Sequence, residues 1–201
     1  MMRRNIKRRR LVFSEIDISL LLYEISERSL FSILMPYARR ILRHKNFSMN
    51  AKIAALDFVE RVWRTGMEYD FCDLKNDLCK IIRNDNYLVA SIALETFFSI
   101  YDDMEFASIN LSRSRNQKLL VGELACYKFI KGNIQKEKFL QTLSNISHQV
   151  LARSCWRIVC VLHHHCKGRK ILRGELFFNN ESWHKLMLKH GKRGVFSDYT
   201  P

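Results

Sequence analysis

Apolar residues recur at helical spacing along almost the whole chain from Ser14 onward. Ser14 and Asp17 form a capping pair for a first helix. Its apolar side contains Ile18, Leu21, Leu22 and Ile25. A second helical stretch runs from Ser29 to Leu42, and Pro36 within it is expected to kink the helix or to mark a boundary. The pattern predicts helices joined by short polar links.

Four later segments repeat one pattern, in which small residues stand beside large apolar ones. Aligned on their small residues, the segments centre on Ala55, Ala93, Ala125 and Cys155. The intervals are 38, 32 and 30 residues, within the range of about 30–47 residues typical of helical repeats. Small side chains let neighbouring helices cross closely, and large ones fill the layer beside them. Amphipathic partner helices are expected at residues 72–82, 106–111 and 139–146.

The most regular of these stretches resembles an armadillo repeat. It comprises a helical pattern over residues 151–162, a short second one over 168–172 and a third over 183–186. The resemblance covers roughly residues 45–190 and lacks the glycine-rich kink of armadillo repeats, so a HEAT-like or mixed array is also open. It implies an all-α superhelix of about four repeats whose groove holds a peptide or partner chain. The alternative is an irregular, compact helical bundle.

The composition favours a helical chain with a single folded domain. Only 2 Pro and 7 Gly interrupt 201 residues, and 47% of them are hydrophobic. We expect a basic tail over residues 1–13, one helical-repeat domain over 14–193 and a C-terminal tail over 194–201. The apolar runs are too short to span a bilayer. The six cysteines favour reduced thiols in the nucleus or cytoplasm.

The charge is strongly basic, with 34 Lys and Arg against 20 Asp and Glu, a net charge of +14. Such a field favours anionic partners, which are acidic protein segments, nucleic acid or a membrane surface, and of these we expect no membrane. A candidate basic face near the C-terminus contains Lys167, Arg169, Lys170, Arg173, Lys185, Lys189, Lys192 and Arg193. Aromatic residues are interleaved with it, which is also typical of a terminal capping repeat. A smaller patch contains Arg39, Arg40, Arg43, His44 and Lys45.

The basic tail carries the sharpest short motif, which closely resembles the Arg-x-Leu-Phe motif that docks ligands on cyclins. Its candidate residues are Lys7, Arg8, Arg9, Arg10, Leu11 and Phe13. In that family a basic residue meets an acidic rim, while the leucine and the aromatic residue enter an apolar cleft. The same tract is typical of a nuclear localisation signal, and a solvated tail is as good an explanation.

No catalytic motif stands out, since phosphate-binding loops, serine elbows and paired metal-binding histidines are missing from the sequence. Cysteines and histidines between Cys155 and Cys166 lack the spacing of a zinc site, so neither a metal nor a cofactor is expected. We therefore expect a non-enzymatic protein-interaction module in a cell-cycle, meiotic or chromosomal assembly. It is expected in the nucleus, or else in the cytoplasm, with homo- or hetero-oligomerisation open. Direct nucleic-acid binding is the alternative function.

Overall fold

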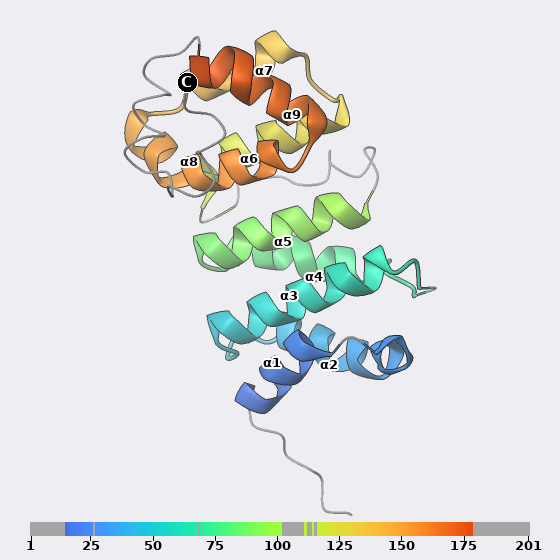
Figure 1. Cartoon of the computed structure of the whole chain (residues 1–201). Helices are drawn as coiled ribbons and strands as arrows, with labels where there is room; N and C mark the ends of the chain where they lie inside the picture. The colour runs from blue at the N-terminus through green and yellow to red at the C-terminus, as the bar shows by residue number, and fades with distance from the viewer. Residues whose placement is uncertain are drawn as a thin grey trace, which may run out of the picture. The chain divides into compact units, whose positions relative to one another are not determined.

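Helices form every regular element in the part of the chain that the computed structural model describes (Figure 1). It describes residues 15–25, 27–67, 69–101, 111, 114 and 116–178, without the side chains of 15–19, 148, 175, 177 and 178. The elements are α1 Glu15–Glu24, η1 Arg28–Leu30, α2 Phe31–Arg43, α3 Met49–Arg64, α4 Leu74–Asn84, α5 Tyr87–Ile100, α6 Gln117–Lys131, α7 Lys136–Ser144, α8 His148–His163, α9 Cys166–Ile171 and the π-helical turn η4 Leu172–Phe178. The all-α prediction is confirmed. The repeat superhelix stays a prediction.

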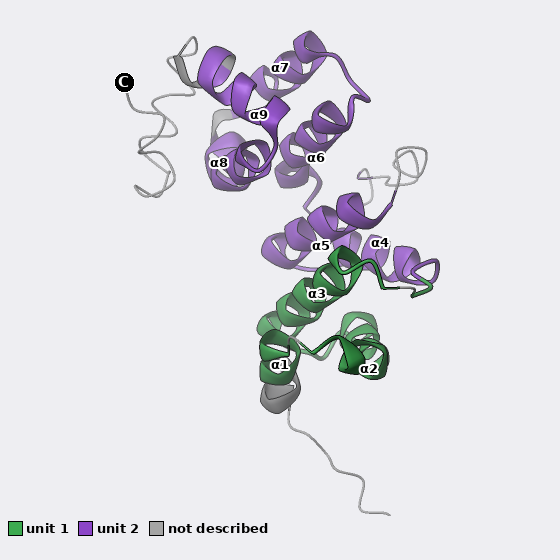
Figure 2. Cartoon of the chain, turned by 45° about the vertical axis from the view of Figure 1, so that its right-hand side comes forward, with its two compact units in different colours: residues 1–70 green, residues 71–201 purple. Residues whose placement is uncertain are grey.

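Contacts divide the chain into two units, residues 1–70 and 71–201 (Figure 2). In unit 1, α1 and α2 both pack on α3. Phe31 of α2 meets Phe58 of α3 edge to face, with ring centroids 5.5 Å apart. Arg61 of α3 donates hydrogen bonds to the carbonyls of Leu22 and Ile25, the latter at 2.8 Å, and so closes the C-terminal end of α1.

The second predicted helix is confirmed, but it is not divided. Pro36 lies inside α2, which continues to Arg43. Proline removes only one backbone donor at this position, and the helix is held by apolar packing on the opposite side. The residues that supply this packing are Phe31, Met35, Ala38, Ile41 and Leu42. Of the two expectations at Pro36, a boundary is wrong, and a kink stays a prediction.

Unit 2 is organised around α5, α6 and α8. Helix α4 pairs with α5, and α6 packs against α7 and most extensively against α8. The predicted partner helices at 72–82 and 139–146 appear as α4 and α7, whereas 106–111 falls almost entirely outside the described residues. Asn86 caps α5, because its side chain accepts a hydrogen bond from the Val89 amide at 3.1 Å.

The small residues lie where the repeat pattern placed them. Ala55, Ala93, Ala125 and Cys155 are all buried, in α3, α5, α6 and α8. Gly122 lies at a close approach of α6 to α8, since a Cβ atom there would lie 2.7 Å from Cδ1 of Ile158. The prediction that small residues permit close helix crossings is confirmed at this position.

Candidate partner-binding groove

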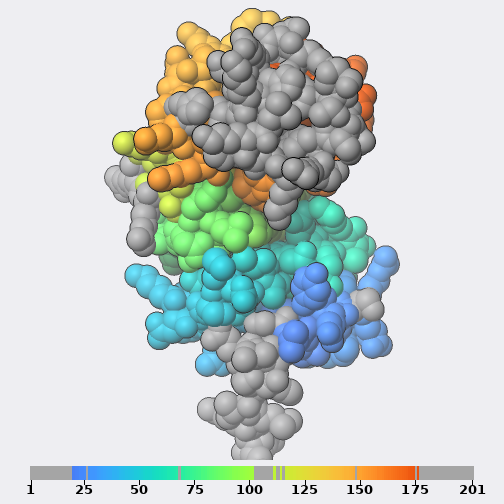
Figure 3. All heavy atoms as spheres, turned by 60° about the vertical axis from the view of Figure 1, so that its left-hand side comes forward, coloured from blue at the N-terminus to red at the C-terminus, as the bar shows by residue number. Residues whose placement is uncertain are grey.

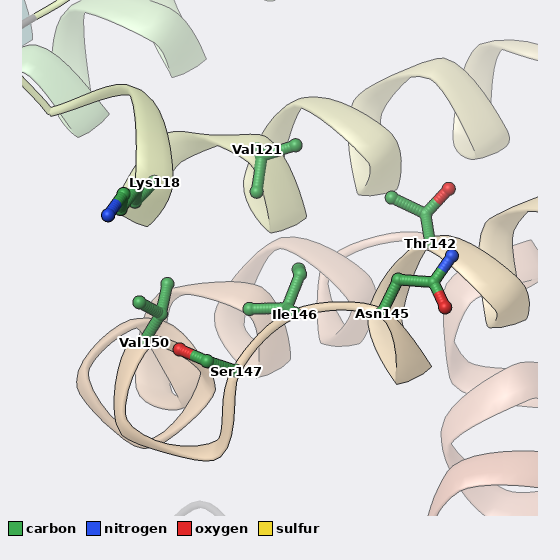
Figure 4. A pocket seen from close by; sticks show the side chains of 7 residues that line it. All are labelled: Lys118, Val121, Thr142, Asn145, Ile146, Ser147 and Val150. Atoms are coloured by element: carbon green, nitrogen blue, oxygen red, sulfur yellow. The ribbon is translucent and has the colours of Figure 1, made fainter.

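A groove opens in unit 2 between α6 and the connection from α7 to α8 (Figure 4). Its volume is about 440 Å³. The residues that line it are Lys118, Val121, Thr142, Asn145, Ile146, Ser147 and Val150. A cleft of this size can hold a short peptide segment or a small molecule.

The groove has apolar walls and a polar rim. Figure 4 shows Val121 on α6 across from Ile146 and Val150. All three side chains are half-buried, so part of each is accessible from the groove. Polar groups at its edges come from Thr142, Asn145 and Ser147, and the Lys118 ammonium stands at one end. Apolar anchors between hydrogen-bonding edges are the usual arrangement of peptide-binding clefts.

Local sequence explains why the groove forms here. Gly122 lets Ile146 approach α6, since an added Cβ atom at Gly122 would lie 3.2 Å from Cδ1 of Ile146. Ile146, in the connection between α7 and α8, therefore reaches α6 and lines the groove. Ser147 stands at the N-cap position of α8, yet its side chain makes no capping hydrogen bond. The electropositive start of α8 thus adds to the charge of Lys118, which lies on the opposite wall.

The surface around the groove is basic. Between residues 116 and 178 the acidic residues are Glu123, Glu137 and Glu175, against many lysines and arginines. Glu123 is fully buried and contributes no surface charge. An acidic partner segment is therefore favoured here over a basic one.

Behind the groove, α5 and α6 are joined by a buried carboxyl. Glu123 of α6 accepts hydrogen bonds from the hydroxyls of Tyr87 and Ser91 of α5, the latter at 2.5 Å. Burial raises the pKa of the Glu123 carboxyl to about 7, although both hydroxyls favour its charged form. Burial and the Glu123 carboxylate also raise the pKa of Tyr87, so its hydroxyl remains a proton donor.

Arg157 extends this network to α8. Its Nε donates to Ser91 Oγ at 2.8 Å, and one terminal nitrogen donates to Glu95 Oε2 at 2.6 Å. One side of α5 carries Tyr87, Ser91 and Glu95 at intervals of four residues. This side contacts α6 through Glu123 and α8 through Arg157. In Figure 3 the atoms of α5, in green, lie beside the orange atoms of later helices. The network ties three helices together.

We assign this network to stability and not to chemistry. Its central carboxyl is fully buried, so a substrate has no direct access to it. Sequence reasoning missed its role, because Glu123 was part of a segment defined by small and apolar residues. The available signal was a carboxylate on the apolar side of a helix, where it requires partners.

Two cations of the predicted basic C-terminal face donate hydrogen bonds to backbone carbonyls near the C-terminal ends of helices. Lys167 donates to the Phe129 carbonyl at 2.8 Å, and its Nζ lies 4.5 Å from the Phe129 ring centroid. Arg169 donates to the His163 carbonyl at 3.0 Å, at the end of α8. Lys170 and Arg173 are exposed on the same segment. Cations at carbonyl ends stabilise helices, so Lys167 and Arg169 have a structural task.

Several candidate residues lie outside the described residues. They are Lys7, Arg8, Arg9, Arg10, Leu11, Phe13, Lys185, Lys189, Lys192 and Arg193. Within the described residues, histidine, cysteine, aspartate and glutamate form no group of three that could hold a metal ion. Cys155 is buried as expected, and burial raises the pKa of its thiol to about 12. A thiol with so high a pKa is a poor nucleophile and a poor metal ligand.

No family model, curated protein or solved structure matches the chain significantly. Among the helices of the described ranges, none combines the length and the apolar character needed to cross a membrane.

Proposed function

We propose that this chain is a non-enzymatic protein-interaction module that captures a segment of a partner protein. The observation that supports this most directly is the groove between α6 and the α7–α8 connection, with apolar walls and a polar rim. The proposed ligand is a peptide with one or two apolar anchors and an acidic residue. The anchors contact Val121 and Val150, and the carboxylate meets Lys118.

The basic tail supplies a second, linear contact in this proposal. Residues Lys7 to Phe13 have the composition of a nuclear localisation signal and resemble a cyclin-docking motif. A cyclin is therefore one partner to test, and a nuclear cell-cycle, meiotic or chromosomal assembly is the proposed setting. A folded groove joined to a linear motif increases avidity without further contact area.

The test is affinity purification with mass spectrometry from the native cell, using the full chain and three variants. Lys118→Glu with Val121→Asp disables the groove, and Leu11→Ala with Phe13→Ala disables the tail motif. Lys136→Glu changes an exposed charge of α7 that does not line the groove and serves as the control. We expect a specific partner to be lost from the groove variant and retained by the control. Retention of every partner by the groove variant contradicts the proposal.

Nucleic-acid binding is the second candidate, and one observation favours it. A hollow of about 380 Å³ on α4 is lined by Lys75, Asn76, Cys79, Lys80 and Arg83. Cations along one helix can follow a phosphate backbone. If this face binds nucleic acid, we expect its affinity for labelled RNA or DNA to fall steeply as the salt concentration rises. The affinity is also expected to fall when Lys80 and Arg83 are changed to Glu. No binding at low salt eliminates this candidate.

A further inference from the structure

The outward side of α2 in unit 1 is apolar at one end and basic at the other. Ile33 is 59% exposed and Tyr37 is 48% exposed. They lie four residues apart and point away from the side of α2 that packs on α3. Pro36, also exposed, stands between them. Arg40 continues the stripe one turn further and is exposed as well. We call Ile33, Pro36, Tyr37 and Arg40 the α2 face.

This face differs from ordinary scattered exposure of apolar residues. Single exposed leucines or tyrosines are common on soluble proteins. Here three apolar side chains cover one helical turn, while the same helix already buries a full core-facing side. Folding of α2 therefore does not require them. A contiguous apolar patch next to charge is typical of a surface that a partner covers.

Charge selects the kind of partner. From Arg28 to Leu56 the chain contains no aspartate or glutamate, while Arg40, Arg43 and Lys45 are exposed. A second copy of this face would bring its own arginines into the contact, and the basic tail of the chain would be repelled. A partner segment with both apolar residues and carboxylates matches the apolar end and the basic end of the face.

We infer that the α2 face binds an amphipathic helix of a partner protein with apolar residues one turn apart and carboxylates beyond them. Its apolar residues cover Ile33 and Tyr37, and its carboxylates pair with Arg40. Helical ligands that dock on apolar stripes use this spacing of anchors. The inference rests on the proposed function, a protein-interaction module, but it concerns a surface in the other unit from the groove.

The experiment uses a displayed library of helical peptides and the full chain. Each peptide carries leucine or phenylalanine at two positions four apart, and glutamate or lysine at the next positions of the same stripe. Peptides selected on the wild-type protein are then measured against Ile33→Ser/Tyr37→Ser, Arg40→Glu, Val121→Asp and one control. The control is Leu88→Ser, which removes an exposed apolar residue of unit 2. Val121→Asp alters the groove and identifies peptides that bind there instead. Thermal unfolding verifies that every variant is folded.

We expect selection of glutamate-bearing peptides and at least about a tenfold loss of affinity for Ile33→Ser/Tyr37→Ser, the effect of removing a central apolar contact. Arg40→Glu is expected to shift the preference to lysine-bearing peptides. The control Leu88→Ser is expected to retain wild-type affinity.

Four outcomes overturn the inference. They are failure to select any peptide, equal binding by Ile33→Ser/Tyr37→Ser, loss of binding only in Val121→Asp, and a concentration-dependent dimer in sedimentation that Ile33→Ser/Tyr37→Ser abolishes. The third outcome leaves the groove proposal intact, and the first two do not affect the affinity-purification result. Failure of the α2 face and failure of the proposed function are thus distinguishable.

Discussion

The α2–α3 pair of unit 1 and the group of α5, α6 and α8 in unit 2 are joined in opposite ways. Unit 1 holds α2 on α3 with aromatic and aliphatic side chains around Phe31 and Phe58, and it leaves Ile33 and Tyr37 outside. Unit 2 places the carboxyl of Glu123 and most of the Arg157 side chain inside, between α5, α6 and α8. Apolar packing tolerates substitution of similar volume, whereas a polar network requires each partner. We therefore expect the stability of unit 2 to depend on the chemical identity of its buried polar side chains. The stability of unit 1 is expected to depend on the volume of its core side chains.

The largest expected effect is in the apolar core of unit 1. Phe58→Ala removes a fully buried ring and its contact with Phe31. We expect the free energy of unfolding to fall by about 3–5 kcal/mol, as measured by urea denaturation. Phe58→Leu, which retains most of the volume, is expected to cost clearly less. Equal losses for both variants would contradict a core governed by volume.

Arg157→Ala tests the polar network of unit 2. The change leaves Ser91 and Glu95 without their shared cation, and we expect a loss of about 2 kcal/mol in unfolding free energy. Arg153→Ala removes an exposed arginine one turn earlier on α8 and is expected to change stability by less than about 0.5 kcal/mol. Arg157→Lys restores the charge without the two-nitrogen geometry, so its stability is expected to be intermediate. Equal stability of the two alanine variants removes the argument for the network.

A third prediction concerns the dependence of stability on pH. Burial raises the pKa of Glu123 from 4.5 to about 7, so the folded protein keeps a proton that the unfolded chain releases. The carboxyl therefore contributes stability that is complete below pH 4.5, decreases as the pH rises toward 7 and levels off above it. Glu123→Gln stays neutral at every pH. In urea denaturation between pH 4.5 and 7, we expect the unfolding free energy of this variant to fall less with pH than that of the wild type. A Gln variant with the wild-type descent would exclude Glu123 as its source.

The smallest expected effect is on the α2 face. Ile33→Ser/Tyr37→Ser removes two side chains that are about half exposed and lie opposite the core. We expect the loss of unfolding free energy to be clearly smaller than that for Phe58→Ala, since about half of each side chain is already exposed in the folded state. Urea denaturation of this variant beside Phe58→Ala measures the contrast within one unit. A loss approaching that of Phe58→Ala would place these residues in the core and remove the α2 face as a free surface.

Much of the fold could be predicted from the sequence, but little of the candidate sites. Helical periodicity and small residues predicted the helices and the buried positions of Ala55, Ala93, Ala125 and Cys155, because these depend on neighbours along the chain. The groove could not be predicted, since it joins Val121 to Val150 across two helices and a turn. Lys167 and Arg169 appeared to be binding cations, because sequence does not show which carbonyls lie within their reach.

The sequence alone determined an all-α chain, its strong positive charge and the small-residue positions where helices cross. These follow from local periodicity, composition and side-chain volume, which need no knowledge of distant contacts. Tertiary structure alone decided that Glu123 is buried with hydroxyl partners, and that Ile33 and Tyr37 remain outside. The same residue types are compatible with either side of a helix until a neighbouring helix covers one of them. Burial is a property of packing, and packing joins residues far apart in the chain.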